Sequence, residues 1–324
     1  MKVLTSYDDC PADAKGAVMA IGNFDGVHRG HQAVLAAAMA KAREAGVPSG
    51  VMVFEPHPRQ FFKPDAAFFR LTPAPMKRRL FAALGLDLTV ELPFGAALAG
   101  LAAEDFVATV LAGGLAVTHV VTGADFHFGK GRGGNPDRLA ELGAGHGFTT
   151  QVVAPVGEPG LVYSSSQVRD HLRLGEVREA AEVLGYWWRV AGTVAGGDRR
   201  GTGLGFPTAN IAAPAGFGLA AGIYAARVVT PQGRFGGAAY FGTRATFGAG
   251  EPRIEVFLFD FSGDLYGQEI EIEFLAFLRG DRAFASAEEL ALRMRSDCED
   301  AKAVIAAIEA SDPMLRFPLG RALA

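Results

Sequence analysis

The sequence predicts two dissimilar domains: an N-terminal α/β domain with a doubly wound parallel sheet, and a C-terminal antiparallel β-barrel that carries a terminal α-helix. In the first half, strand-like and helix-like patterns alternate, which is typical of a parallel sheet with helices on both faces. After residue 185, period-two runs separated by turn-rich stretches indicate antiparallel strands in a barrel or sandwich. The chain has 324 residues, of which 49% are hydrophobic, so it is long enough to form two cores. We therefore expect domains at 1–185 and 186–324.

The first half contains the apolar runs and amphipathic stretches of an alternating fold. The apolar runs predict strands at 17–22, 49–54, 87–92, 117–122 and 149–154. The stretches between and after them predict helices at 30–45, 74–84, 103–112, 164–173 and 176–185. Ligands on such a sheet bind at the carboxyl ends of the strands, where the strand order reverses.

The second half carries alternating patterns that predict strands, followed by one helical pattern. The alternating runs lie at 187–196, 222–230, 235–242, 253–261 and 268–278. Ser286 and Glu289 form a capping box, which predicts a final amphipathic helix over about 287–309. The tail from Asp312 is expected to be a loop.

The composition argues against several classes of protein. A formal net charge of −4 disfavours a nucleic-acid coat or a membrane-surface protein. Cys10 and Cys298 form no CxxC pair, which favours reduced thiols in a cytosol. The N-terminus lacks the apolar core of a signal peptide, and no run approaches the length of a membrane span. We expect a cytoplasmic protein whose partners are small molecules, with no nucleic acid and no membrane, and we predict no particular oligomeric state.

The most informative stretch is 18–35, VMAIGNFDGVHRGHQAVL, where an apolar run ends in a turn and a helix begins. His28 and His31 are three residues apart at the start of this helix, so both imidazoles lie on one face. Free N–H groups and the helix dipole attract anions there. Glycines let a ligand approach the backbone without meeting Cβ atoms; they are Gly22, Gly26 and Gly30. The arrangement suits the polyphosphate of a nucleotide, and a plain glycine turn is the structural alternative.

Three further segments of the first half carry candidate functional residues. His57 lies between two prolines at a strand end, and the segment 122–134, TGADFHFGKGRGG, follows another strand. In the segment 163–172, YSSSQVRDHL, serine hydroxyls and helix N–H groups would hold terminal phosphates with Arg169 reaching back, unless the serines form only an N-cap. Lys130 stands in no GxxxxGK[ST] pattern, which excludes a Walker-type loop.

At these residues the chain resembles a known family. GNFDGVHRGH, GADFHFG and SSSQVR are similar to the adenylyltransferase half of the bacterial bifunctional riboflavin kinase/FMN adenylyltransferases, also called prokaryotic FAD synthetases. The resemblance extends over about 16–308. It implies a nucleotidyltransferase domain followed by a riboflavin kinase domain, with ATP, riboflavin and FMN as substrates, FAD as a product, and Mg²⁺ as the cofactor.

The resemblance also implies site residues in the first domain, where His28 and His31 would be catalytic. The nucleotide would contact Gly22, Asn23, Phe24, Asp25, Gly30, Ser164, Ser165 and Arg169. The flavin would contact Asp125, Phe126, Phe128 and His57. Asp25 keeps a second interpretation as a turn residue. The phosphate of FMN, whose second pKa is about 6, is already ionised at pH 7, so the reaction needs charge neutralisation rather than a base.

The second half carries a separate phosphate-site signature. Six glycines occur between residues 192 and 205, and FPTANI follows at 206–211. Flexible glycines bring backbone N–H groups to phosphate; the nucleotide-binding candidates are Gly201, Gly203 and Gly205. Thr208 and Asn210 alternate in an extended segment, so both side chains project to one side. A hydroxyl and an amide carbonyl are oxygen donors suited to Mg²⁺.

The kinase reaction calls for a base, because the 5′-hydroxyl of riboflavin is neutral. Glu255 is the candidate, since alternation turns it away from its apolar neighbours Ile254 and Val256. In the resembled family, the Glu of an E-V-H-L-like strand is the kinase base. A solvent-facing strand Glu is the structural alternative.

Four positions depart from the family pattern. In the first domain, His127 stands where the family commonly has Arg, and Ser166 where it commonly has Thr. In the second domain, Phe257 replaces a His, and Ala245 replaces a Pro. Two rival functions remain open. Proteins with an HxGH motif also transfer nucleotides to other phosphorylated acceptors, and the departures at His127, Phe257 and Ala245 suggest a flavin-binding protein without turnover.

Overall fold

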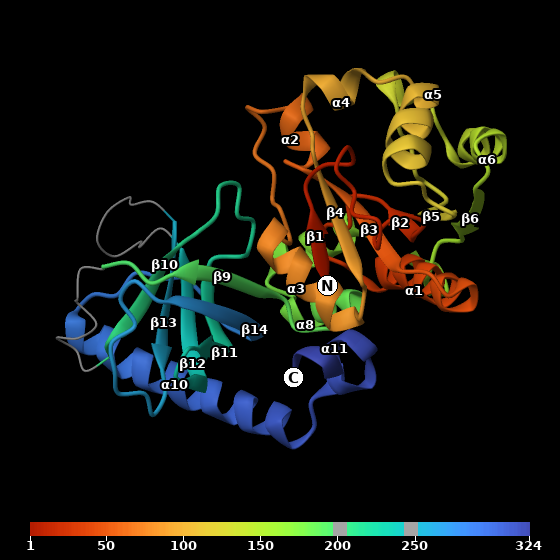
Figure 1. Cartoon of the computed structure of the whole chain (residues 1–324). Coiled ribbons are helices and arrows are strands. Elements are labelled where there is room, and N and C mark those ends of the chain that lie inside the picture. The colour runs from red at the N-terminus through yellow and green to blue at the C-terminus, as the bar shows by residue number, and fades with distance from the viewer. Residues whose placement is uncertain (197–205, 243–251) are drawn as a thin grey trace. The chain divides into compact units, whose positions relative to one another are not determined.

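The computed structural model describes residues 1–196, 206–242 and 252–324 (Figure 1). Contacts between residues divide the chain into two compact units, Met1–Ser165 and Ser166–Ala324. Within these described ranges, no helix combines the length and the apolar character needed to cross a lipid bilayer.

The first unit is built on a six-stranded sheet in the order β1-β4-β3-β2-β5-β6, and every adjacent pair is parallel. The strand order reverses between β2 and β5, so the turn that follows β2 lies at the position where ligands bind to such sheets. The predicted parallel sheet is therefore confirmed. Its strands are β1 (Lys2–Leu4), β2 (Val18–Ile21), β3 (Ser49–Glu55), β4 (Leu88–Pro93), β5 (His119–Gly123) and β6 (Thr149–Val153).

Helices cover both faces of this sheet. Helix α1 contacts β2, β3 and β5, whereas Met19 and Ile21 of β2 face the opposite way, into a core shared with Phe106 and Val110. Burial on both faces explains why β2 is apolar at every position. The helices are α1 (Arg29–Ala45), α2 (Pro58–Phe62), α3 (Ala74–Leu84), α4 (Ala96–Gly100), α5 (Ala103–Asp105), η1 (Phe106–Gly114), η2 (Lys130–Arg132) and α6 (Pro136–Gly145). A small hairpin follows, formed by β7 (Gly157–Glu158) and β8 (Leu161–Val162).

Several helices of the first unit differ from the sequence prediction, which did not include the short α2, α4 and η2. The stretch 103–112 was expected to be one α-helix, but it is the short α5 followed by the π-helix η1. The Leu115 N–H donates to the Val110 carbonyl at 3.0 Å, a spacing of five residues that widens the helix at its glycine-rich end. Helix α6 was not predicted, although the Asn135 side chain caps it and Pro136 begins it.

The second unit contains a six-stranded antiparallel sheet in the order β10-β13-β12-β11-β14-β9. An antiparallel bridge between Ala195 and Asn210 connects its two edges, so the sheet curls into a nearly closed barrel. Of the two predicted architectures, the barrel is the correct one. Its strands are β9 (Arg189–Thr193), β10 (Thr208–Ala212), β11 (Gly222–Thr230), β12 (Gly233–Gly242), β13 (Arg253–Leu258) and β14 (Glu269–Gly280).

Helices complete the second unit. Helix α10 runs along the barrel and contacts β11, β12 and β14 (Figure 1). The Ser286 hydroxyl accepts a bond from the Glu289 N–H at 3.2 Å, which confirms the predicted N-cap. The expected loop from Asp312 is wrong: the Asp312 carboxylate caps η3, and Pro313 and Pro318 begin two short helices. The helices are α7 (Ser165–Leu174), α8 (Val177–Leu184), α10 (Ala287–Ala310), η3 (Pro313–Arg316) and α11 (Pro318–Leu323).

Candidate active site

The turn after β2 contains backbone conformations that side chains rarely adopt. Phe24 and Val27 have φ angles of 48° and 41°, and Gly26 has a φ angle of 86°. Left-handed backbone at a residue other than glycine costs about 1–3 kcal/mol and persists only where the surroundings enforce it. Such strain is typical of ligand-binding turns, so the contacts that enforce it are part of the site.

The two histidines of the motif lie together at the start of α1. His28 is the N-cap, and its Nδ1 accepts a hydrogen bond from the His31 N–H at 3.3 Å. That bond leaves Nε2 of His28 to carry the proton of the neutral ring. The two rings stack with centroids 3.6 Å apart, and Phe24 meets the His31 ring at 5.1 Å in a T-shaped contact. The structure therefore brings together the predicted catalytic pair and one predicted nucleotide-binding residue.

His31 is held as a neutral ring. Burial lowers its pKa well below 6.5, and the electrostatic influence of His28 and the positive charge of Lys77 lower that pKa further. Within the described part of the chain, Nδ1 of His31 is buried and has no hydrogen-bond partner. A buried imidazole nitrogen with no partner is costly unless a ligand or water completes it, so this atom is a marker of the site.

Asp25 ties the turn to the segment before α3. Its carboxylate is 3% exposed and accepts bonds from the Leu71 N–H at 3.1 Å and the Thr72 N–H at 3.0 Å. The Thr72 hydroxyl donates to the same carboxylate at 3.2 Å and accepts from the Gly26 N–H at 2.8 Å. This geometry favours the interpretation of Asp25 as the residue that fixes the turn.

A charged cluster that the sequence analysis missed also supports the turn. Lys77, on α3, has a side chain that is 1% exposed; its Nζ lies 2.6 Å from the Glu55 carboxylate and donates to the Asn23 carbonyl at 3.2 Å. Arg70 donates to both oxygens of Glu55. Burial lowers the pKa of Lys77. Burial opposes ionisation of Glu55 too, but Arg70 and Lys77 leave the pKa of that carboxyl lowered.

The serine segment reaches the same turn through one contact. The Ser165 hydroxyl, at the start of α7, donates to the Asp25 carbonyl at 2.8 Å. Ser164 is half-buried, and Arg169 is 8% exposed on the following turn of α7. The structure thus joins Ser165 to the histidine turn, while Arg169 belongs by its contacts to the second compact unit.

The residues assigned to the flavin lie after β5. The rings of Phe126 and Phe128 stack with centroids 5.5 Å apart, and Phe128 is buried against Phe106. Asp125, which precedes them, is exposed. At the departure His127, a guanidinium is supplied by Arg132, whose Nη2 lies 3.0 Å from the His127 Nδ1.

His57 lies at a different carboxyl end of the same sheet, after β3. It is the N-cap of α2: its Nδ1 accepts from the Arg59 N–H at 3.1 Å, and its ring lies 4.7 Å from that of Phe68. Nearby, Phe62 is 63% exposed and contacts Phe94 with ring centroids 5.7 Å apart. The sequence analysis did not single out these aromatic residues, because isolated Phe residues carry no positional signal.

On the barrel, the proposed base and one metal candidate are direct cross-strand neighbours. Glu255 of β13 pairs with Asn210 of β10 on one side and with Tyr240 of β12 on the other. Paired residues project from the same face of a sheet. Ile254 and Val256 are fully buried, whereas Glu255 is partly exposed, so the predicted alternation is confirmed.

Asn210 presents an unsatisfied oxygen beside Thr208. Its amide nitrogen donates to the Thr208 carbonyl at 3.1 Å and lies 3.5 Å from the Thr208 Oγ1. Among the described residues, the Asn210 Oδ1 is buried and finds no hydrogen-bond partner. A buried acceptor next to a hydroxyl is the donor set that a hard cation would complete. The candidate glycines of this site and one departure lie outside the described residues; these are Gly201, Gly203, Gly205 and Ala245.

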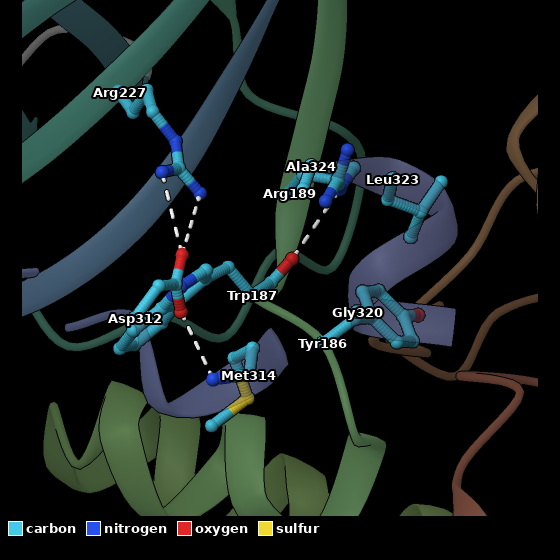
Figure 2. Close-up of a pocket in the computed structure, with 9 residues that line it drawn as sticks. All are labelled: Tyr186, Trp187, Arg189, Arg227, Asp312, Met314, Gly320, Leu323 and Ala324. Carbon is cyan, nitrogen blue, oxygen red and sulfur yellow. Dashed lines mark hydrogen bonds and ion pairs between the residues drawn. The ribbon is translucent and has the colours of Figure 1, made fainter. Parts of the chain in front are cut away.

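A cavity in the second unit lies apart from these residues (Figure 2). Its charged groups neutralise one another: Arg189 pairs with Glu271 at 2.9 Å and with Glu273 at 2.7 Å. Arg227 pairs with Glu273 and, at 3.4 Å, with Asp312. The cluster therefore anchors the C-terminal segment to the barrel. The cavity is lined by Tyr186, Trp187, Arg189, Arg227, Asp312, Met314, Gly320, Leu323 and Ala324.

The first unit is a parallel α/β unit with a histidine-bearing turn at its switch point. The second is a barrel with a carboxylate beside an oxygen-donor pair. Together these features define a transferase of phosphate-containing groups. Residues 10–167 match the family model described as FAD synthetase, and residues 184–305 match the model described as riboflavin kinase. The chain therefore belongs to the family of bifunctional riboflavin kinase/FMN adenylyltransferases.

Relatives of known name match nearly the whole chain. The bifunctional riboflavin kinase/FMN adenylyltransferase of Pseudomonas fluorescens is 39% identical over 307 residues, which cover 94% of this chain and 98% of the relative. The protein of the same description from Escherichia coli K12 is 36% identical over 287 residues, or 88% of this chain and 92% of the relative. A crystal structure described as a macrolide-efflux protein from Streptococcus pneumoniae superposes with a TM-score of 0.82 at 27% identity, covering 93% and 98% of the two chains.

Proposed function

We propose that this chain phosphorylates riboflavin to FMN and then adenylylates FMN to FAD, using ATP in both steps. The observation that carries this proposal is the match of two family models to separate parts of the chain, one on each side of about residue 170. The two candidate sites also differ in the way that the two reactions require. Among the described residues of the barrel, the partly exposed Glu255 pairs across strands with Asn210, whose Oδ1 is buried and unsatisfied. We assign adenylyl transfer to 1–185 and the kinase reaction to 186–324.

In adenylyl transfer, a phosphate oxygen of FMN attacks the α-phosphorus of ATP, the bond to the β-phosphate breaks, and pyrophosphate leaves. FMN is ionised at neutral pH, so no base is required. Hydrogen bonds from His28 and His31 would neutralise the charge that develops on the phosphates. The N–H groups and side chains that we expect around the nucleotide are those of Gly22, Asn23, Phe24, Gly30, Ser164, Ser165 and Arg169. Asp25 would act by holding the turn.

The flavin would occupy the first unit beyond the carboxyl ends of its strands. Asp125, Phe126 and Phe128 would contact it from the segment after β5, and His57 from the segment after β3. The stacked pair of Phe rings supports this assignment, because aromatic faces suit a planar ring system. At the departure His127, the neighbouring Arg132 offers the positive charge that the family usually places there.

In the kinase reaction, Glu255 would take the proton of the riboflavin 5′-hydroxyl while its oxygen attacks the γ-phosphorus and ADP leaves. The Thr208 hydroxyl and the Asn210 carbonyl oxygen would hold Mg²⁺, and the unsatisfied Asn210 Oδ1 fits that role. When bound, Mg²⁺ would neutralise charge on the phosphates. Backbone N–H groups of Gly201, Gly203 and Gly205 would contact the nucleotide. We further propose that the protein is cytoplasmic, with small molecules rather than nucleic acid as its partners.

The test is a product assay with purified protein, riboflavin, ATP and Mg²⁺, followed by chromatography. We expect FMN to appear first and FAD second, with release of ADP and then of pyrophosphate. The absence of both products would contradict the proposal. Flavin binding without release of ADP or pyrophosphate would indicate a carrier instead, and turnover of another phosphorylated acceptor in place of FMN would indicate a different nucleotidyltransferase.

A further inference from the structure

The turn that carries the histidines needs support from outside its own sequence. Phe24 and Val27 hold left-handed backbone, which a β-branched residue such as Val27 adopts rarely. Asp25 and Gly26 are bonded to Thr72. These contacts fix the second half of the turn. In the first half, the Gly22 N–H donates to the Met52 carbonyl at 3.2 Å, and the Asn23 carbonyl has another partner.

That partner is Lys77. From α3, its Nζ donates to the Asn23 carbonyl at 3.2 Å, and its side chain is 1% exposed. A buried lysine is retained in proteins only where it is paired. Here the pairing is with Glu55 at 2.6 Å, and Glu55 is shared with Arg70. The carboxylate of Asp25 also faces Lys77, so two carboxylates and two cations lie together behind the turn, and of the two cations Lys77 donates to the Asn23 carbonyl.

We propose that Lys77 is a positioning residue for adenylyl transfer, which holds the Asn23 carbonyl and places a fixed positive charge behind the stacked histidines. The inference rests on the function proposed above for the first unit. The bond to Asn23 fixes the turn before Phe24, whose ring contacts His31. The charge favours a polyphosphate in front of the turn, because a fixed cation in a poorly solvated place acts over a longer distance than one in water.

The charge also bears on the protonation of His31. The groups that face His31 are His28 in its own segment and Lys77 from α3. Those that face Lys77 are Glu55, Arg70 and Asp25. Burial, the electrostatic influence of His28 and the charge of Lys77 keep the pKa of His31 low, so the ring enters the reaction neutral. Without the charge of Lys77, the pKa of His31 would rise.

The experiment compares Lys77→Met, which leaves Glu55 paired with Arg70, with the double variant Glu55→Gln/Lys77→Met, which also removes the carboxylate that pairs with Lys77. The control is Lys41→Met, which removes an exposed lysine of α1 whose partner is Glu44. FAD formation from FMN, ATP and Mg²⁺ is followed as a function of pH, and riboflavin phosphorylation is followed separately. This assay starts from FMN, so it reports only on the first unit.

We expect kcat/KM for FAD formation to fall about 10- to 100-fold in both Lys77 variants, as is usual when a reacting group is slightly misplaced. We also expect the pKa that His31 gives to the kcat/KM profile to move to higher pH. Riboflavin phosphorylation and the Lys41→Met control should match the wild type. A structural brace alone would lower the rate without moving that pKa.

Three results would overturn the inference. The first is a folded Lys77 variant with wild-type kcat/KM, and the second is a reduced rate with an unchanged pH profile. The third is loss of the calorimetric unfolding transition of the first unit in both variants, because Lys77 would then be required for folding rather than for positioning. Failure of the wild type itself to convert FMN to FAD would instead contradict the proposed function.

Discussion

His31 and His28 are fixed to one short turn, so a change at His31 removes one hydrogen-bond donor and leaves the remaining contacts of the nucleotide in place. We expect His31→Ala to stop the sequence of reactions at FMN. Removal of one donor to a developing charge costs about 10²–10³-fold in rate, so FAD formation from FMN should fall by that factor. Riboflavin phosphorylation, measured on the same sample, should be unchanged. Equal loss of both activities in folded protein would contradict the assignment of separate sites.

We expect a change at Glu255 to have the opposite effect, with loss of the kinase reaction and not of adenylyl transfer. Loss of a general base costs about 10²–10⁴-fold, so Glu255→Ala should reduce FMN formation by that factor and spare the conversion of FMN to FAD. The matched control is Glu269→Ala, which removes an exposed carboxylate at the start of β14. Kinase activity of Glu255→Ala near that of the control would show that Glu255 is only a surface residue.

The buried imidazole of His31 predicts a dependence of stability on pH. Its pKa in the folded protein lies well below 6.5, and its value in the unfolded chain is about 6.5. Above that pH both states are neutral and His31 contributes nothing. As the pH falls below it, only the unfolded chain gains the proton, so the free energy of unfolding falls by up to about 1.4 kcal/mol per pH unit. The free energy of unfolding, measured with denaturant between pH 7.5 and 5, should depend less steeply on pH in His31→Gln than in the wild type. The pKa of His119 is lowered as well, but His119 contributes equally to the pH dependence of the wild type and of His31→Gln.

At the scale of elements, local signals account for most of the agreement between sequence and structure. The run 49–54 predicted β3, and the full burial of its apolar residues made the pattern easy to read. Two kinds of element escaped prediction. Strand β1 has three residues, too few to show a period. Helix α6 and the helices after Asp312 begin with caps and prolines rather than with an apolar stripe.

The helices after Asp312 depend on its carboxylate. This dependence leads to a prediction about the stability of the second unit. The Asp312 carboxylate accepts bonds from the Trp187 Nε1 and the Met314 N–H, both at 2.9 Å, and pairs with Arg227 (Figure 2). Asp312→Ala removes a cap and leaves buried donors unpaired, so we expect the free energy of unfolding of the second unit to fall by about 2–4 kcal/mol. Asp300→Ala, at an exposed ion pair on α10, should change it by less than about 0.5 kcal/mol. Chemical denaturation followed by Trp fluorescence measures both.

At the scale of the whole molecule, the sequence predicted the part of each site that lies within one segment. His28 and His31 are neighbours through helix geometry alone, and the alternation in β13 turned Glu255 away from its apolar neighbours. The supports of the first site come from residues far away in the sequence, such as Thr72, which bonds to Asp25 and to Gly26, 46 positions before it. No spacing rule connects such residues, because the fold alone brings them together.

Two compact units with different chemistry lead to a final prediction, about the passage of FMN between the sites. Each unit has its own core, so His31→Ala should retain a working kinase site and Glu255→Ala a working adenylyltransferase site. If FMN is released by the protein molecule that makes it, a 1:1 mixture of the two variants should convert riboflavin to FAD, although neither variant does so alone. FAD should appear after a lag that shortens as the protein concentration rises, because free FMN must accumulate before it is used. A mixture that makes FMN but no FAD, while Glu255→Ala still adenylylates added FMN, would show that FMN passes only within one molecule.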